Sequence, residues 1–233
     1  MHLFHCPDLD TELVQLPEEE AHHATSVLRL GHGVRVGLLN GRGVRVEAVL
    51  EHVGRREVTA RVVERIEVPL ERKHRIHLAV APTKQMERYE WFVEKAVEIG
   101  VDRITPLVTA RTERAKLRID RLDRVAISAM KQSQRAWLPT IDELTPLADL
   151  LKRELPDQRY FGWCEGEHAS LMQCYSGNGD VLVLVGPEGD FTNTEADLLR
   201  EHHFAAVSLG TARLRTETAA LAACTWMSLA QQR

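Results

Sequence analysis

The stretch VLVLVGPEGD at residues 181–190 decides the fold class of this 233-residue chain. Its first five residues are all apolar, which is typical of a parallel strand buried on both faces of a sheet. Two glycines and a proline follow directly and predict a tight turn at the carboxyl end of that strand. Ligands of open α/β sheets bind at this end. The stretch therefore predicts an α/β fold and a ligand-facing turn at residues 186–189.

Strand and helix patterns alternate on both sides of this stretch. Apolar residues from Tyr89 to Val97 recur with helical spacing, and Gly100 predicts the end of that helix. Further strands are expected at residues 76–81, 101–108, 160–163 and 205–209, and further helices at residues 120–136, 194–202 and 216–231. The alternation predicts a parallel sheet covered by helices.

The N-terminal part of the chain has a different pattern. Short strand-like segments joined by Gly-rich turns are expected at residues 34–39, 44–50 and 58–63, after a short helix at residues 18–30. They predict a small antiparallel, barrel-like β unit. The charged, proline-marked segment at residues 69–74 predicts a linker. The expected domains are therefore residues 1–70 and residues 75–233.

Composition excludes several classes of protein. Hydrophobic residues make up 44% and charged residues 27%, an ordinary globular balance. No apolar run reaches the length of a membrane span, and the N-terminus lacks a signal-peptide pattern. The four cysteines form no CxxC pair and have no metal-ligand spacing to histidine. We expect a cytoplasmic protein that binds no membrane and no metal.

The charges are unevenly distributed. The net charge is −4, yet residues 111–135 hold eight basic and three acidic side chains, while residues 142–201 are strongly acidic. Such segregation is typical of a face that binds a polyanion. A solvated helix face explains the basic segment equally well.

A second polar segment, LGTARLRTETA at residues 209–219, follows a predicted strand and precedes an apolar helix. Thr216 or Thr218 is expected to cap this helix, whose N-terminus favours a carboxylate or phosphate.

By itself, the turn at residues 186–189 matches an ordinary βα turn, and it lacks the P-loop and dinucleotide-binding glycine patterns. The helix after Ala219 is apolar nearly all round, and this fits either core burial or a dimer interface.

Taken together, these segments resemble the 16S ribosomal RNA uracil-N3 methyltransferases of the SPOUT superfamily. The matching residues run in order over nearly the whole chain: His23, 27–29, Lys84, 86–87, 94–96, 98–101, Pro106, 113–114, 132–133, Arg135, 186–189 and 214–218. The last two matches are specific as a pair, and the others are individually weak. Two departures are Asp190, where the family usually has glycine, and the pair Ala212-Arg213.

The resemblance implies an N-terminal PUA-like barrel that binds RNA and a C-terminal α/β domain with a trefoil knot. It also implies a homodimer, 16S rRNA of the small ribosomal subunit as substrate, and S-adenosyl-L-methionine as methyl donor. The residues implied to bind the donor are Val185, Gly186, Pro187, Glu188, Gly189, Leu209, Gly210, Leu214, Arg215, Thr216 and Thr218.

Roles in the reaction follow from the chemistry of uracil N3, which carries a proton at neutral pH and lies on the Watson–Crick edge. Our hypothesis is that Arg215 stabilises charge on the uracil oxygens and that Glu217 accepts the proton. The alternative is that Glu217 only orients Arg215. The residues expected to bind RNA are His23, Arg29, Lys84, Arg88, Arg111, Arg114 and Arg135.

Other functions remain open at this point. A SPOUT enzyme acting on a ribose 2′-hydroxyl or another base would share the C-terminal segments. A non-enzymatic RNA-binding ribosome assembly factor would use the same basic face. A nucleotide-dependent dehydrogenase is disfavoured because its glycine fingerprint is missing.

Overall fold

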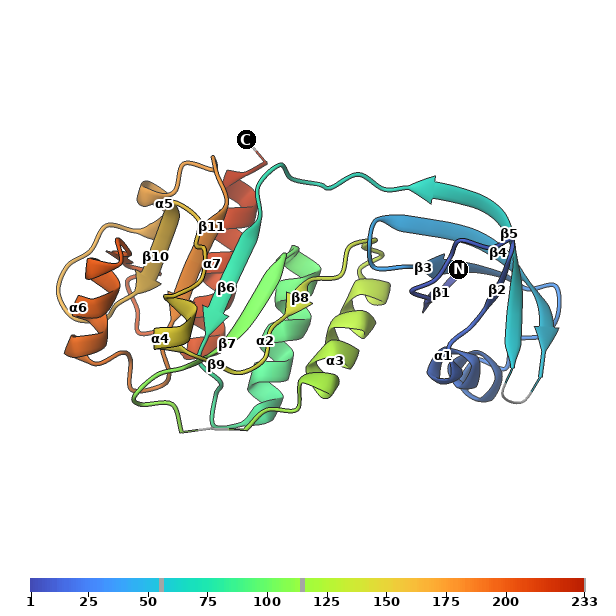
Figure 1. The fold of residues 1–233 in the computed structure, drawn as a ribbon, viewed down its shortest axis with the longest axis horizontal. Coiled ribbons are helices and arrows are strands. Elements are labelled where there is room, and N and C mark those ends of the chain that lie inside the picture. The colour runs from blue at the N-terminus through green and yellow to red at the C-terminus, as the bar shows by residue number, and fades with distance from the viewer. Residues whose placement is uncertain (55–56, 114–115, 233) are drawn as a thin grey trace. The chain divides into compact units, whose positions relative to one another are not determined.

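The computed structural model describes residues 1–54, 57–113 and 116–232. The chain divides into two compact units, one formed by Met1–Glu71 with Ile127–Leu138 and the other by Arg72–Ala126 with Pro139–Arg233 (Figure 1). Residues 127–138 were expected within the second domain, but they pack with the first unit.

The first unit is built on a five-stranded sheet. The strands, in spatial order, are β1 (His2–His5), β3 (Arg35–Leu39), β4 (Val44–Val53), β5 (Val58–Glu67) and β2 (Leu13–Gln15). The expected strands are present as β3, β4 and β5, and they pair antiparallel. β1, which was not predicted, pairs parallel with β3. The apolar residues that alternate along these strands form one core, with Phe4, Leu38 and Leu50 fully buried.

The helix expected at residues 18–30 is shorter and changes its hydrogen-bond pattern. An α-helix, α1 (Glu18–His22), continues as a π-helical turn, η1 (His23–Val27). The chain then turns at Arg29, whose φ of 53° is left-handed and ends the helix. Single π-helical turns are rare and often occur at functional sites.

Polar contacts explain why residues 127–138 belong to the first unit. The Lys131 ammonium lies 2.6 Å from the Glu20 carboxylate, and both side chains are largely buried. The same carboxylate accepts a hydrogen bond from the His5 amide at 3.1 Å. The Trp137 indole donates to the Val68 carbonyl at 3.0 Å. A buried charge requires a partner, so Lys131 holds its segment against α1.

The second unit contains the predicted parallel sheet. Its strands, in spatial order, are β12 (Ala205–Val207), β10 (Gln158–Gly162), β11 (Val181–Val185), β6 (Ile76–Val80), β7 (Arg103–Val108) and β8 (Thr140–Ile141), and β9 (Thr145–Pro146) also pairs with β7. Every pair in this sheet is parallel. β11 is buried along its whole length, as the uniformly apolar sequence predicted.

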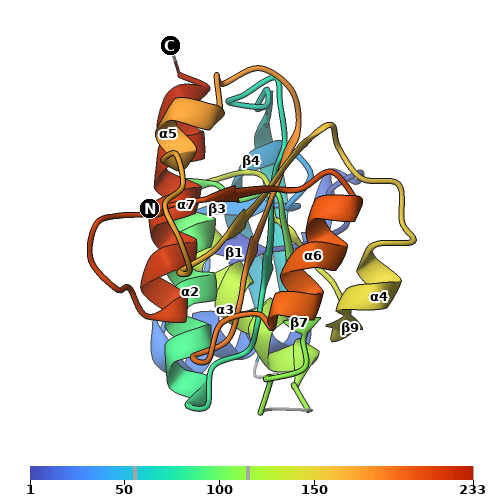
Figure 2. The same cartoon turned by 90° about the vertical axis from the view of Figure 1, so that its left-hand side faces the viewer.

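Helices cover both faces of this sheet (Figure 2). The helices are α2 (Met86–Ile99), α3 (Ile119–Gln132), α4 (Leu147–Leu150), α5 (Leu171–Cys174), α6 (Asn193–Glu201) and α7 (Thr216–Ala230). Leu182 and Leu184 of β11 pack with residues of α4 and α6 on one face. On the other face, α2 and α7 pack against each other, and α7 contacts β6 and β11.

Most predicted elements of the second unit are confirmed to within a few residues. α3 ends at Gln132 rather than at residue 136, because Gln134 adopts a left-handed φ of 59°. The short elements β8, β9, α4 and α5 were not predicted, since two to four residues are too few for a periodic pattern. No helix within the described residues is long and apolar enough to cross a membrane.

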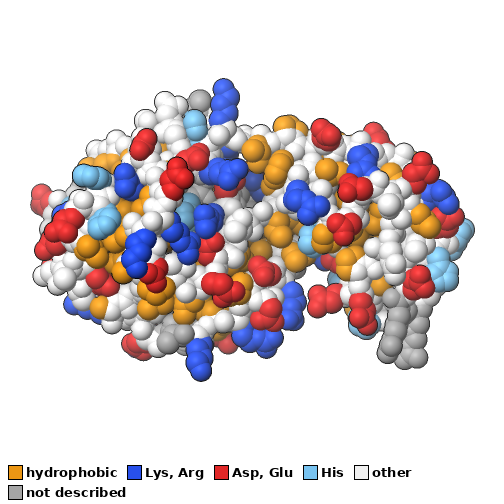
Figure 3. Space-filling model, viewed as in Figure 1, with side chains coloured by type: hydrophobic (Ala, Val, Ile, Leu, Met, Phe, Trp, Pro, Cys, Tyr) orange, Lys and Arg blue, Asp and Glu red, His pale blue; other side chains and the backbone are white. Residues whose placement is uncertain are grey.

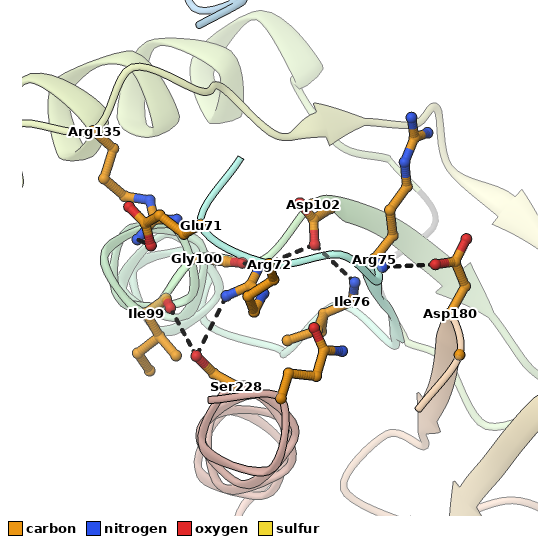
Figure 4. A network of polar contacts seen from close by, with 12 residues as sticks. Glu71, Arg72, Arg75, Ile76, Ile99, Gly100, Asp102, Arg135, Asp180 and Ser228 are labelled. Carbon is orange, nitrogen blue, oxygen red and sulfur yellow. Dashed lines mark hydrogen bonds and ion pairs between the residues drawn. The ribbon is translucent and has the colours of Figure 1, made fainter. Parts of the chain in front are cut away.

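A buried arginine organises the amino end of the sheet (Figure 4). The Arg72 side chain is only 5% exposed and lies 3.0 Å from the Asp102 carboxylate. Its guanidinium also donates to the Gly100 carbonyl and, at 3.3 Å, to the Ser228 hydroxyl of α7. Asp102 in turn accepts from the Ile76 amide at 2.7 Å. These contacts tie the beginnings of β6 and β7 to the C-terminal part of α7.

A second polar network lies at the same end of the sheet. His77 of β6 contacts the Thr105 hydroxyl at 2.7 Å, and that hydroxyl donates to Asp142. Asp142 also pairs with Arg103 at 2.9 Å and with Arg153 at 3.0 Å. Burial lowers the pKa of His77 to about 4, and Arg103 adds to this shift. The imidazole is therefore neutral at physiological pH.

Candidate functional site

The loops that leave the parallel strands meet at one edge of the second unit. Parallel strands all present their carboxyl ends to the same edge. Val80 of β6 lies beside Val185 of β11, and Gly162 of β10 lies beside Val207 of β12. The two stretches singled out in the sequence therefore leave strands on either side of β10.

Residues 186–191, called here the Gly186 loop, form a compact turn after β11. The Asp190 amide donates to the Pro187 carbonyl at 2.9 Å and closes the turn. Gly186 has no room for a side chain, because a Cβ atom there would lie 3.1 Å from the Phe191 nitrogen. Glu188 and Gly189 are exposed at the tip. The loop thus offers backbone groups and one exposed carboxylate to a ligand.

Thr216 joins the two sequence stretches. Its hydroxyl donates to the Gly186 carbonyl at 3.1 Å, and both groups are buried. The prediction that Thr216 or Thr218 caps the last helix was wrong, because the N-cap residue of α7 is Arg215 and no side chain caps it. Thr216 instead fixes the start of α7 against the Gly186 loop, across 30 residues of sequence.

The segment between β12 and α7 is more open. Leu209 is buried, and it packs so closely on Gly162 that a Cβ atom at that glycine would lie 2.9 Å from the Leu209 Cδ1 atom. Gly210 has a φ of 154°, within the region that favours glycine. Leu214 is half-buried, whereas Arg215 and Thr218 are exposed. The arginine proposed for catalysis therefore faces solvent at the start of α7.

Glu217 has a partner that the sequence did not predict. Its side chain is 9% exposed and lies 4.0 Å from the Arg88 Nε atom of α2. Within the described residues, the ion-pair partner of Glu217 is Arg88 rather than Arg215. Arg88 was expected to bind RNA, but its guanidinium faces the buried carboxylate of α7. Nothing in the sequence signals this pair, because 129 positions separate its members.

Lys84 lies in the loop after β6 and contacts the carboxylates of Glu188 and Glu113. Its amide donates to the Glu188 carboxylate at 3.2 Å. Its ammonium lies 2.6 Å from the Glu113 carboxylate, and this hydrogen bond raises the pKa of Lys84. Glu188 is thereby linked from the Gly186 loop to the neighbouring β6 exit.

Further hydrogen bonds in and around the Gly186 loop involve the side chains of Arg111, Asp190 and Glu195. Arg111 donates to the Gly189 carbonyl and, at 3.0 Å, to the Phe191 carbonyl. Asp190 accepts from the Cys164 amide at 3.0 Å. Burial and, second, the Asp190 carboxylate raise the pKa of the Cys164 thiol. Glu195 accepts from the Ala110 amide at 2.7 Å.

The sequence carried a signal for Glu195 only. Thr192-x-x-Glu195 is a capping-box pattern, and the structure shows both of its hydrogen bonds. The contacts of Arg111 and Asp190 carry no such signal, because they join different loops.

The predicted RNA-binding residues are distributed over both units. In the first unit, His23 and Arg29 are exposed, while Arg135 is only 15% exposed and pairs with Glu71 at 3.1 Å. In the second unit are Lys84, Arg88 and Arg111, and Arg114 lies outside the described residues.

Several described arginines of the basic segment are paired with carboxylates. Arg118 and Arg124 pair with Asp120, and Arg121 pairs with Glu90. On the face shown in Figure 3, Lys and Arg side chains are interspersed with Asp and Glu. Within the described part of the chain, no group of three or more His, Cys, Asp or Glu residues is placed to hold a metal ion.

Comparison with known proteins places this geometry in a family. The family described as "RNA methyltransferase domain" matches residues 70–228, and the family described as "RNA methyltransferase PUA domain" matches residues 16–63. The Rickettsia conorii protein named "Ribosomal RNA small subunit methyltransferase E" is 32% identical over 209 residues, covering 88% of this chain and 85% of that protein.

Solved structures agree with this assignment. A probable rRNA-methyltransferase from Porphyromonas gingivalis is 39% identical with a TM-score of 0.91, covering 100% of this chain and 99% of that one. A ribosomal RNA small subunit methyltransferase E from Neisseria gonorrhoeae, bound to S-adenosyl methionine, is 27% identical with a TM-score of 0.90, covering 98% and 97%. The resemblance drawn from the sequence and the expected fold class are confirmed, and the chain belongs to the RNA methyltransferase family, as an enzyme with an N-terminal PUA-like domain.

Proposed function

We propose that this enzyme transfers a methyl group from S-adenosyl-L-methionine to N3 of a uridine in 16S rRNA of the small ribosomal subunit, in the cytoplasm. The observation that carries the proposal is the Thr216–Gly186 hydrogen bond, which joins the two family-specific stretches at one sheet edge. Relatives that are similar over most of this chain bear the name of a small-subunit rRNA methyltransferase, and the structure of one of them is bound to S-adenosyl methionine.

The edge fits the methyl donor chemically. Gly189 and Gly210 are exposed and have no side chain to shield the backbone around them, which suits recognition of an adenine edge. The groups that would hold the donor are those of the Gly186 loop together with Leu209, Gly210, Leu214, Arg215, Thr216 and Thr218. The bound donor supplies an already activated sulfonium methyl group, so the enzyme's main task is alignment.

The residues at the start of α7 would handle the charge and the proton of the uracil. Arg215 is exposed at the edge, where its guanidinium can stabilise negative charge on the uracil oxygens. Glu217 lies beside Arg88, 4.0 Å from its Nε atom. A carboxylate at this place is suited to accept the N3 proton, directly or through water.

RNA binding would use both units. His23 and Arg29 of the first unit are exposed next to the π-helical turn, and a PUA-like domain of this family covers that region. Arg135 would have to leave Glu71 to reach a phosphate. The salt dependence of RNA binding should weaken when His23 and Arg29 are replaced, since each phosphate contact adds to the slope.

We infer that a second copy of the chain covers an apolar surface of α5 and α7. Met172 is 62% exposed and Leu229 is 54% exposed, and both line a cavity with Tyr175 and Trp226. Exposed clusters of large apolar side chains mark interaction sites. Light scattering should report a dimer for the native chain and a monomer for Leu229→Glu.

The resemblance to the SPOUT methyltransferases also implies a trefoil knot in the C-terminal domain, and we include this knot in the proposal.

Mass spectrometry of 16S rRNA from cells with and without the protein tests the function directly. We expect one uridine to lose an N3 methyl group when the protein is absent, and purified protein with S-adenosylmethionine to restore it. Loss of a ribose 2′-O-methyl group or of another base methyl group instead would assign the enzyme to the alternative reaction. An unchanged methylation pattern, with no donor binding in calorimetry, would identify a non-enzymatic RNA-binding factor.

A further inference from the structure

Asp190 has an unusual backbone conformation, and its carboxylate accepts two hydrogen bonds from backbone amides. Its φ is 61°, in the left-handed region where Asp is tolerated better than most residues. One carboxylate oxygen accepts from the Cys164 amide at 3.0 Å, and the other accepts from the Phe191 amide at 2.8 Å. The side chain therefore links the Gly186 loop to the loop that leaves β10.

Arg111 holds the same loop from the side of β7. Its NH1 group donates to the Gly189 carbonyl and, at 3.0 Å, to the Phe191 carbonyl. The stem of Arg111 passes so close that a Cβ atom at Gly189 would lie 3.2 Å from its Cδ atom. Glycine at position 189 thus permits this approach.

The segment that carries Arg111 is itself fixed. The Ala110 amide donates to the Glu195 carboxylate at 2.7 Å. The other oxygen of that carboxylate accepts from the Thr192 amide at 2.8 Å, at the N-terminus of α6. Arg111 therefore projects from a backbone that is tied to the helix following the Gly186 loop.

We propose that Asp190 and Arg111 form a two-sided clamp that preorganises the Gly186 loop for binding the methyl donor, an inference that rests on the proposed function. Both side chains form hydrogen bonds with backbone groups of the loops, so they act as positioning residues. Preorganisation raises affinity because the loop loses its conformational entropy on folding rather than on ligand binding. Arg111 would then serve the donor site rather than the RNA phosphates predicted for it.

Calorimetry of the full-length protein with S-adenosylmethionine and with S-adenosylhomocysteine tests the clamp. Asp190→Gly keeps the left-handed conformation accessible and removes both hydrogen bonds, and Arg111→Ala removes the other side. Each should weaken binding of both ligands alike, by about tenfold, equivalent to about 1.4 kcal/mol. Asp190→Asn retains a single acceptor oxygen, so its affinity for both ligands should lie between that of Asp190→Gly and that of the native protein.

Controls separate the clamp from its rivals. Lys152→Ala and Asp197→Ala remove charges from exposed ion pairs elsewhere in this unit and should leave both affinities unchanged. Hydrogen exchange at residues 186–191 should quicken in the clamp variants while exchange in β11 stays slow. Native protein that binds neither ligand would refute the donor assignment itself.

Three results would overturn the clamp although the native protein binds the donor. The first is unchanged affinity in Asp190→Gly and Arg111→Ala. The second is a loss confined to the positively charged donor, which would indicate direct electrostatic recognition by Asp190. The third is an Arg111→Ala variant with native donor affinity and a lower salt slope for RNA binding, which would assign Arg111 to a phosphate.

Discussion

The parallel sheet of the second unit has buried ion pairs at its amino end, whereas its carboxyl end combines ion pairs with exposed polar groups. At the amino end, charged groups pair with each other, as Arg72 does with Asp102 and Arg103 does with Asp142. At the carboxyl end, Asp190 and Arg111 bond backbone groups of loops, and Arg215 stays exposed. The amino end therefore contributes stability, while the carboxyl end keeps groups available for a ligand. Substitutions at the two ends should separate these properties.

The largest effect is expected for the two residues at the start of α7. Arg215→Ala and Glu217→Gln should each lower the single-turnover rate of methyl transfer by about 10²–10³-fold, because they remove charge stabilisation and the proton acceptor. Donor affinity, measured separately by calorimetry, should change little in Glu217→Gln, whereas Arg215→Ala also removes a group proposed to hold the donor. Native single-turnover rates in both variants would rule out the proposed roles. The unfolding midpoint of Arg215→Ala should stay near the native value, since this side chain is exposed.

At the other end of the sheet, Arg72→Met should reduce the free energy of unfolding by about 3 kcal/mol, because it leaves Asp102 and the Gly100 carbonyl without their buried cation. Urea unfolding measures this loss. Ser228→Ala removes one weaker contact of the same guanidinium and should cost less. The single-turnover rate of both variants should remain native under folding conditions. A large rate loss in Arg72→Met would show that the two ends are coupled.

Acid should destabilise the amino end through His77. The pKa of this group is lowered from 6.5 to about 4 in the folded protein, with burial as the main cause. The unfolded chain therefore binds a proton between these values that the folded protein does not, so the free energy of unfolding falls as pH drops through this window. The loss should reach roughly 2–3 kcal/mol. In His77→Gln, urea unfolding at pH 7 and pH 4.5 should show a smaller difference. An equal pH dependence in both proteins would contradict the assignment.

The smallest effect is expected for the hydrogen bond that joins the two family-specific stretches. Thr216→Val removes the hydroxyl that donates to the Gly186 carbonyl and should lower the free energy of unfolding by about 1 kcal/mol. Donor affinity should fall severalfold, since the start of α7 is no longer fixed to the loop. Thr225→Val, whose hydroxyl bonds only within α7, is the matched control. Equal donor affinity in both variants would mean that this bond serves stability alone.

Periodicity predicted the second unit well and the first unit less well. The long regular helices α2 and α7 and the apolar strand β11 were found close to their observed bounds, because burial imposes a repeat on their sequences. The parallel pairing of β1 with β3 was missed, because four residues at the chain start carry no repeat of their own. The packing of residues 127–138 with the first unit depends on Lys131 reaching Glu20, which are 111 positions apart.

At the candidate site, the sequence by itself determined the reactive groups and the strand ends that present them. The Gly-Pro-x-Gly turn and the charged Arg-Thr-Glu-Thr segment could be predicted from the sequence. Backbone freedom and local charge depend on residues that follow one another in the chain. Only the tertiary structure decided which groups meet: Thr216 with Gly186, Glu217 with Arg88, and Asp190 and Arg111 with the loop between them. Such contacts join residues in loops and helices that follow different strands. Their geometry follows from strand order and register, which local sequence does not specify.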